Sequence, residues 1–472
     1  MEMKLEEIKK FAAGNKIEFI DVKFVDLSGG WHHITLPIES LDKELFENGI
    51  GVDGSSLRGF TSIERGDMIL LPDPETLFVD PFFDQATISF IGNIMESGRT
   101  VTPYSRCPRR VAAAAERYVS KVVKGAQALI GPEFEYYVFD RADYRQQPGM
   151  AYYRIKSAET DDIDDDSSDY LGYKIGWKKG YHAAPPLDRT FNLRSEISTL
   201  LKNVGVGLKY HHHEVGGRGQ HEIETKFQPL LKMADQSMLV KYMVKNHCFR
   251  SNRSATFMPK PLFNEPGSGM HVHQYLAING NSLFFDKSGK NVLSKEGLFY
   301  IGGILKHVDS LLAFTNPSTN SFKRLVPGFE APVAGTYSMG NRTACIRIPG
   351  YQRNPKTMRF EFRPPDATMN PYLGYAAMVM AGLDGIKNRI DPGKPLDKNL
   401  DDLSKIELDK IHQLPTSLDR ATKALEADHY YLLEGGVFSE DLIENWLKVR
   451  NDDFGNIGRQ PTVGEFELYY DC

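Results

Sequence analysis

Residues 211–224 read His-His-His-Glu-Val-Gly-Gly-Arg-Gly-Gln-His-Glu-Ile-Glu, and the rest of the chain is organised around them. The pattern predicts a strand from Lys209 to Glu214, a glycine-rich turn over 215–219, and a second strand from His221 to Phe227. A hairpin of this kind would bring Glu214 and Glu222 close together. We therefore expect two carboxylates at one place on a sheet.

A second stretch, residues 131–137, reads Gly-Pro-Glu-Phe-Glu-Tyr-Tyr and has the same character. The period of two in a strand puts Glu133 and Glu135 on one side, roughly 6.5–7 Å apart. Phe134 and Tyr136 then face the other way. This stretch predicts a strand with one apolar and one anionic face.

Two further segments, 269–276 and 358–363, alternate in the same way. The first places His271 and His273 on one face, and the second alternates apolar side chains with Arg359, Glu361 and Arg363. Several strands therefore offer polar faces to one place.

Acidic groups crowded on inward faces repel one another unless cations neutralise them, and this favours a Mg²⁺ or Mn²⁺ site. One histidine among several carboxylates suits these metals. Tetrahedral zinc is disfavoured because no pair of cysteines at ligand spacing accompanies the histidines. A solvent-facing acidic sheet would give the same pattern, so the residues alone leave both interpretations open.

Composition sets the outer limits. The chain has 472 residues, 41% hydrophobic and 25% charged, a net charge of −5 and a pI near 6.3. The length allows about two to four domains, and the charge argues against a nucleic-acid partner. The four cysteines are scattered, the N-terminus lacks an apolar signal core, and the apolar runs are too short to span a membrane. We expect a cytoplasmic protein without a membrane partner.

The first hundred or so residues predict a small mixed domain, with a helix over 4–13, a strand over 17–26 and a turn that holds Asp53 at its tip. Glycines and prolines over 91–106 indicate a linker. A larger domain follows, with helices expected at 108–124, 188–204, 229–249, 296–314, 371–389 and 416–427. The acidic run at 161–169 predicts a solvated loop.

Positive charge gathers in the last third of the chain, at Lys323, Arg324, Arg342, Arg347, Lys356, Arg359 and Arg363. Guanidinium groups pair well with phosphate and carboxylate, so an anionic substrate fits beside the acidic faces. Salt bridges to the glutamates are the alternative role. Acids, cations and metals in one cleft suggest phosphoryl transfer, although no Walker loop is present.

The ordered motifs resemble those of a known family. They are Asp53-Gly54-Ser55-Ser56, Gly131-Pro132-Glu133-x-Glu135, His211-His212-His213-Glu214, Gly267-Ser268-Gly269-Met270-His271-x-His273, Asn341-Arg342 and Glu361-x-Arg363-x-Pro365-Asp366. In this order and spacing, over nearly the whole chain, they resemble bacterial type I glutamine synthetase.

That resemblance implies an α+β fold, with a small N-terminal β-grasp-like domain over 1–103 and a large catalytic α/β barrel, open at one end, over 104–472. It implies ATP-dependent ligation of ammonia to L-glutamate through a γ-glutamyl phosphate. It also implies two divalent cations, Mg²⁺ or Mn²⁺, per active site. The matching ligands are Glu135, Glu214 and Glu222 for one ion, and Glu133, His271 and Glu361 for the other.

The resemblance assigns roles to further residues. Asp53 would take the proton from ammonium, Glu330 would be the acid of a flap that shields the intermediate, and Arg342 would assist catalysis. The glutamate and ammonium sites would use Gly267, Arg324, Glu330, Arg342, Arg363 and Tyr181. ATP would be bound by His273, Arg342, Arg347, Lys356 and Arg359.

In the family Asp53 reaches the site from the neighbouring subunit, so a homo-oligomer, a dodecamer of two stacked hexameric rings, is expected. The tail Glu467-Leu468-Tyr469-Tyr470 resembles the segment that locks the rings together. Many members are silenced by adenylylation of a tyrosine at the place of Asp401. Because no tyrosine lies between 391 and 428, we expect no stable adenylylation here.

Three departures from the family pattern concern the substrates: Pro266 replaces an asparagine, Tyr275 a serine, and Lys209 an acid found near the nucleotide. Two alternatives to the ammonia ligase remain: a ligase that joins glutamate to a larger amine, and a non-catalytic structural relative. Retention of Asp53, Glu330 and Tyr181 favours ammonia. Retention of all six metal positions disfavours the non-catalytic relative.

Overall fold

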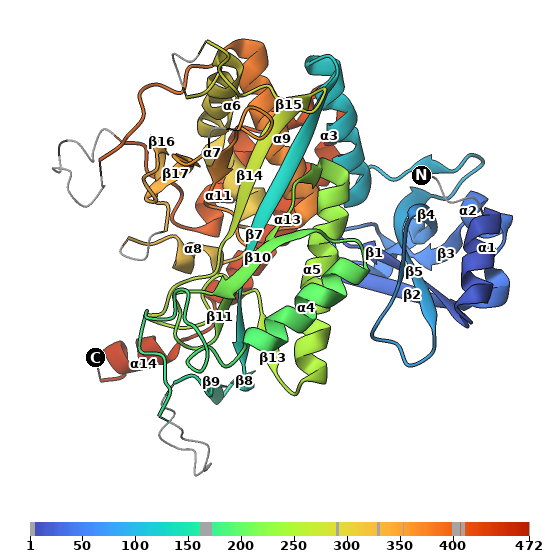
Figure 1. The fold of residues 1–472 in the computed structure, drawn as a ribbon, viewed down its shortest axis with the longest axis horizontal. Helices are drawn as coiled ribbons and strands as arrows, with labels where there is room; N and C mark the ends of the chain where they lie inside the picture. Colours follow the sequence, from blue (N-terminus) through green and yellow to red (C-terminus); the bar gives the residue numbers. More distant parts are fainter. Residues whose placement is uncertain are drawn as a thin grey trace.

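The computed structural model describes residues 5–160, 172–288, 292–327, 331–352, 354–398, 406 and 411–471. Its first part is a sheet built on the N-terminal hundred residues, drawn in blue in Figure 1. The strands are β1 (Phe19–Val25), β2 (Trp31–Pro37), β3 (Ile50–Asp53), β4 (Asp67–Val79), β5 (Thr87–Glu96) and β6 (Thr102–Pro103). They are ordered β2-β1-β5-β4-β3, with β6 on β5 and with β1 and β5 parallel. Helices α1 (Leu5–Gly14) and α2 (Lys43–Glu47) complete this part.

The predicted linker at 91–106 is wrong for residues 91–96, because these belong to the central strand β5. Gly92 was taken as a breaker, yet a Cβ on it would lie 2.4 Å from Cδ1 of Leu70 and 3.1 Å from Cγ1 of Val22. This glycine therefore allows close packing inside the sheet.

The second sheet carries the polar strands. Its members are β7 (Ala126–Phe139), β10 (Leu208–His213), β11 (Gln220–Thr225), β12 (Gln228–Pro229), β13 (Ser254–Thr256), β14 (Met270–Ile278), β15 (Asn281–Ser282), β16 (Ala334–Met339), β17 (Ala344–Ile348) and β18 (Phe360–Phe362). The main order is β10-β11-β7-β14-β18-β17-β16, and the two outermost of these described strands do not pair with each other. The sheet is thus open, and the predicted α+β architecture of a small domain followed by a large one is confirmed. A separate hairpin, β8 (Arg141–Gln147) and β9 (Met150–Lys156), was not predicted.

Helices cover the apolar side of this sheet (Figure 1). The described helices of this part of the chain are α3 (Pro108–Val122), α4 (Phe191–Asn203), α5 (Leu230–Arg250), α6 (Lys295–Lys306), α7 (Val308–Thr315), α8 (Ser321–Arg324), α9 (Pro371–Asn388), α11 (Leu418–Ala427), α12 (Tyr430–Leu433), α13 (Glu440–Gly458) and α14 (Val463–Tyr469). Helix α14 does not cover the sheet, because it projects from the molecule and buries none of its residues. Helix α9 is buried along nearly all of its length and contacts α3, α5 and α6. It is the central helix of the large domain.

One predicted helix, 296–314, is in fact two, because α6 and α7 meet at His307. The imidazole lies between two carboxylates, with Nδ1 2.8 Å from Oδ2 of Asp428 and Nε2 2.9 Å from Oδ2 of Asp384. These long-range contacts fix the break. Among the described residues no single helix has the length and apolar character of a membrane span, and α6 with α7 reaches them only as a pair bent by 76°.

Alternation along β7 links the two sides of the sheet. Phe134 and Tyr136 are fully buried in the core, whereas Glu133 and Glu135 point away from it. β11 pairs with β7 so that Glu222 lies opposite Glu135, and β14 pairs so that His271 lies opposite Glu133. The registers therefore bring the acidic residues of three strands onto one face.

Candidate functional site

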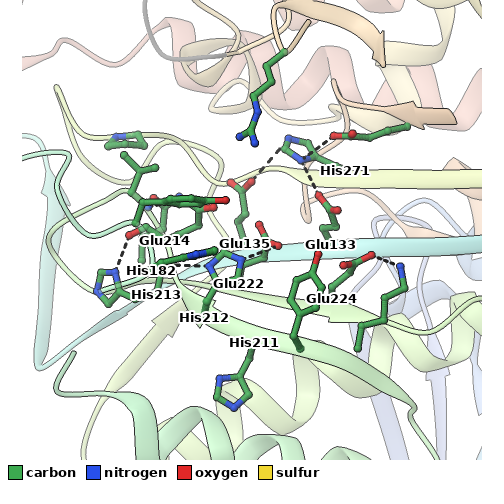
Figure 2. A pocket seen from close by; sticks show the side chains of 18 of the residues that line it. Glu133, Glu135, His182, His211, His212, His213, Glu214, Glu222, Glu224 and His271 are labelled. Carbon is green, nitrogen blue, oxygen red and sulfur yellow. Dashed lines mark hydrogen bonds and ion pairs between the residues drawn. The ribbon is translucent and has the colours of Figure 1, made fainter. Parts of the chain in front are cut away.

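The polar face of the second sheet forms the floor of a cavity of about 1370 Å³. Figure 2 shows its carboxylates and imidazoles rising from β7, β10, β11 and β14. The cavity gathers residues that are far apart in the sequence. The predicted site residues that line it are Glu133, Glu135, Tyr181, Glu214, Glu222, Gly267, His271, Arg324, Arg342, Arg347, Arg359, Glu361 and Arg363.

A first acidic group lies at the hairpin of β10 and β11. Ligand atoms of His212, Glu214 and Glu222 lie within 4.8 Å of one another. Burial, together with the charges of Glu135 and Glu222, raises the pKa of Glu214 to about 9. Burial and the neighbouring carboxylates of Glu133 and Glu135 raise the pKa of Glu222 well above its usual value. At neutral pH this group must hold protons or a cation.

A second group joins Glu133, His271 and Glu361, whose ligand atoms also lie within 4.8 Å of one another. Nδ1 of His271 is 3.2 Å from Oε2 of Glu133 and 3.5 Å from Oε1 of Glu361. Glu361 is fully buried and accepts from Nε of Arg347 at 2.6 Å and Nη1 of Arg363 at 2.5 Å. Although burial raises the pKa of Glu361, the charge of Arg363 outweighs it, and the pKa falls to about 2. This carboxylate is ionised.

Both groups fit a divalent cation of the Mg²⁺ or Mn²⁺ type. Their donors are carboxylate oxygens and single imidazoles, which such ions accept, and no thiolate lies among the ligand groups of the described residues. Glu214 and Glu222 lie among other carboxylates and supply negative charge that a cation would neutralise. Glu135 lies beside the first group and also accepts from the backbone N of Gly269 at 2.7 Å.

Guanidinium groups form the opposite wall of the cavity. Nη1 of Arg324 donates to the carbonyl of Pro364 at 2.7 Å, and its Nη2 lies 3.3 Å from Nε2 of His271. Arg359 lies over the ring of Phe227, with 5.3 Å from Cζ to the ring centroid. The cavity therefore pairs a cation-binding floor with an anion-binding wall.

Three predicted site residues that the structure describes do not line the cavity. Asp53 is exposed on a turn, where it accepts from the Oγ atoms of Ser55 and Ser56 at 2.6 Å each, and the Ser55 hydroxyl is the main cause of its lowered pKa. Lys356 is exposed, and His273 is buried behind Glu133, with 2.7 Å between Nε2 and Oε1. Glu330 lies outside the described residues.

The cavity is also lined by residues that were not predicted as ligands or substrate contacts, and three of them carry charge or a ligand atom beside the predicted carboxylates: His212, Lys209 and Glu224. The sequence pattern could have predicted two of them, His212 and Glu224. His212 pairs with Glu222 across the hairpin, and Glu224 follows Glu222 by two, so strand alternation puts all three on one face. Lys209 carried no such signal, because its direction depends on an irregularity in the β10–β11 pairing.

Comparison with known proteins gives matches over both parts of the chain. Residues 105–469 match the family described as "Glutamine synthetase, catalytic domain", and residues 16–97 match "Glutamine synthetase, beta-Grasp domain". A protein of Mycobacterium bovis named glutamine synthetase is 45% identical over 475 residues, covering 99% of this chain and 98% of that protein. One from Streptomyces filamentosus, with the same name, is 47% identical over 467 residues, covering 99% of each.

Solved structures agree with these sequence matches. A Plasmodium falciparum glutamine synthetase superposes with a TM-score of 0.91 at 26% identity, covering 99% of each chain. A structure titled GmaS/ADP complex superposes with a TM-score of 0.82 at 29% identity, covering 100% of each chain. With both domains matched and the relatives alike over nearly their full length, the chain belongs to the glutamine synthetase family and is a glutamate–ammonia ligase.

Proposed function

We propose that this cavity converts L-glutamate, ammonia and ATP to L-glutamine, ADP and phosphate through a γ-glutamyl phosphate. The observation that carries the proposal is the meeting of an acidic cation-binding floor and an arginine wall in one cavity. A carboxylate is a poor electrophile, so transfer of the γ-phosphoryl group to the glutamate side chain must precede attack by ammonia. Enzymes catalyse such transfers mainly by positioning and charge neutralisation.

Two divalent cations, Mg²⁺ or Mn²⁺, are proposed for the floor. Glu135, Glu214 and Glu222 would hold one of them, and Glu133, His271 and Glu361 the other. Bound there, the ions would neutralise charge that builds up on the transferring phosphoryl group. The raised pKa values of Glu214 and Glu222 support the first site, because burial and neighbouring carboxylates disfavour their ionised forms until a cation binds.

The walls would hold the substrates. Arg324 and Arg363, beside Gly267, are proposed to bind glutamate, and Tyr181 to line the ammonium site by cation–π attraction. Arg342, Arg347 and Arg359 would bind the phosphates of ATP, with His273 acting through Glu133. Lys356 would have to approach from its exposed position, and Glu330 is proposed as the shielding acid of the flap.

A second copy of the chain is proposed to complete each site. Asp53 is the proposed base for ammonium, yet it does not line the cavity of its own chain. A carboxylate at an exposed turn suits delivery to a neighbouring subunit. Helix α14 exposes Phe466 by 56% and Leu468 by 72%, and Tyr470, which follows the helix, is exposed by 78%. This exposure of apolar side chains favours their burial against another chain. We propose the dodecamer of two stacked hexameric rings on these grounds.

Two further proposals concern the whole chain. A cytoplasmic location fits the three described cysteines, Cys107, Cys248 and Cys345, which are all buried and free. The division at 103/104 remains our proposal for the domain boundary, since α3 begins at Pro108 after the short strand β6.

Turnover of the purified protein with glutamate, ATP and a panel of amines tests the proposed function. We expect glutamine and ADP in equal amounts, no turnover without a divalent cation, and a higher kcat/KM for ammonia than for methylamine or ethylamine. A preference for a larger amine would identify the alternative γ-glutamyl ligase. Absence of turnover with every amine would support the non-catalytic alternative.

A further inference from the structure

A third cation-binding group lies on the cavity floor beside the two described above. Glu224 follows Glu222 by two on β11 and pairs in register with Glu133 of β7. Ligand atoms of Glu133, Glu224 and His273 all lie within 4.8 Å of one another. By geometry and donor type this group resembles the other two. Figure 2 shows Glu224 beside Glu133.

This group contains a cation from the chain, as the second group does where Arg347 and Arg363 pair with Glu361. Nζ of Lys209 bonds to Oε1 of Glu224, whose side chain is only 3% exposed. The pairing of β10 with β11 shifts register between Leu208 and Tyr210, which is where Lys209 lies. Such irregularities redirect a side chain, and here the side chain lines the cavity.

The Lys209 ammonium is held from a second direction by an aromatic ring. Nζ lies 4.7 Å from the ring centroid of Phe227, and Cζ of Arg359 lies 5.3 Å from the same centroid. Two cations therefore share one ring at the arginine side of the cavity. Lys209 remains 24% exposed, so its ammonium also faces the open space of the cavity.

We propose that the Lys209 ammonium is the resident cation of the Glu133–Glu224–His273 group, where it takes the place of a third divalent ion and faces the nucleotide phosphates. The second half of this inference rests on the proposed function, which places ATP beside Arg359. An ammonium has three donors. Since one bonds to Glu224, the others can reach a phosphate oxygen.

Electrostatics explains why the lysine and the glutamate belong together. Glu224 is buried and lies in register with Glu133, and the ammonium of Lys209 is ion-paired with it. Breaking such a buried pair by removing one partner leaves an uncompensated charge. A variant without the ammonium therefore leaves oxygen ligands close together without their cation, and with Mn²⁺ in excess the ion should bind.

Counting bound Mn²⁺ tests this inference without any turnover. Mn²⁺ alone is titrated into the full-length protein, free ion is measured by electron paramagnetic resonance, and the total by elemental analysis after dialysis. We expect Lys209→Met to bind one Mn²⁺ per chain more than the parent does, and the double variant Lys209→Met/Glu224→Gln to lose that extra ion. Lys226→Met is the matched control, because Lys226 is exposed on the same hairpin and does not line the cavity.

An unchanged Mn²⁺ count in Lys209→Met overturns the inference. Lys209→Gln is also expected to bind one extra Mn²⁺ per chain. It replaces Lys209→Met if thermal unfolding shows that the methionine variant does not fold. If the parent makes no glutamine, the proposed function fails, but the extra ion in Lys209→Met still supports the resident-cation role.

The second part of the inference, that Lys209 faces the nucleotide phosphates, is tested by measuring ADP affinity with calorimetry at saturating Mg²⁺. The double variant Lys209→Met/Glu224→Gln has neither the ammonium nor the extra ion, so loss of one charge-assisted contact should weaken its ADP binding by about 10-fold. The KM for glutamate should stay within about twofold, because glutamate is proposed to bind at the other end of the cavity. ADP binding as tight as in the parent would overturn this part of the inference.

Discussion

Mixing two inactive variants decides whether Asp53 works in the cavity of a neighbouring subunit. Asp53→Asn removes the proposed base, and because an amide cannot accept the ammonium proton, we expect a loss of about 10²–10⁴-fold in glutamine formation. Glu361→Gln disables the cavity of its own chain. The amide keeps the shape of the buried side chain between Arg347 and Arg363, so the fold should tolerate it better than alanine.

The expected recovery follows from where the two residues lie. Glu361 is on the floor of the cavity, whereas Asp53 is on an exposed turn outside it. Suppose that each active site combines the cavity of one chain with Asp53 of another. In a mixed oligomer a site is then intact only when an Asp53→Asn chain supplies the cavity and a Glu361→Gln chain supplies Asp53. Random assembly of equal amounts gives each condition a probability of one half, so about a quarter of parental activity should return.

The two chains are co-expressed with different affinity tags, and doubly tagged oligomers are purified and checked by native mass spectrometry. A parallel mixture of Asp53→Asn with the Asp53→Asn/Glu361→Gln double variant should give no recovery, because no chain in it supplies Asp53. If mixed oligomers of the two single variants are no more active than the variants alone, Asp53 does not act between subunits.

Three further predictions concern stability and control. Glu361→Ala removes the buried carboxylate with which both Arg347 and Arg363 form ion pairs, so the free energy of unfolding in urea should fall by about 3–5 kcal/mol. A loss below about 1 kcal/mol would contradict this. The carboxylates of Asp384 and Asp428 overcome the effect of burial and raise the pKa of His307. Below pH 6.5 the parent should therefore be about 2 kcal/mol more stable to unfolding than His307→Asn. This difference in stability should shrink as pH rises through the raised pKa of His307. A difference that stays constant from pH 6 to 9 would show that His307 is not charged in the folded protein. The sequence has Asp401 in place of the tyrosine that is adenylylated in many members of the family. After incubation with an adenylyltransferase and ATP, mass spectrometry should therefore find no stable AMP adduct on peptides from 391–415. An adduct that appears together with a loss of activity would refute this prediction.

Much of the cavity floor could be predicted because strand alternation is a local property. Glu133 and Glu135 were placed on one side of a strand from spacing alone, and Glu214 and Glu222 were placed together by the predicted hairpin. The register of the sheet then brings Glu222 opposite Glu135. The arginine wall was also visible in the sequence, since Arg359 and Arg363 alternate around Glu361. Short-range patterns were sufficient wherever a strand determined the direction of a side chain.

Features that depend on distant partners could not be predicted. The linker expected at 91–106 rested on Gly92, and only the side chains of Leu70 and Val22 reveal why a glycine is needed inside that strand. The break between α6 and α7 similarly depends on carboxylates many residues away from His307. In both cases the sequence shows the unusual residue but not the contact that explains it.

The β10–β11 hairpin brings two kinds of charged group to the cavity. His213 lines the cavity, but it is buried with Nε2 3.0 Å from Oε2 of Glu159, so this imidazole has an acidic partner. Glu214 and Glu222, on the same hairpin, have pKa values that are raised by burial and by the carboxylates around them. The hairpin therefore balances the charge of one group and leaves an excess of acidic groups at the other. Folding requirements alone do not explain such an excess, whereas a site that must bind cations requires it.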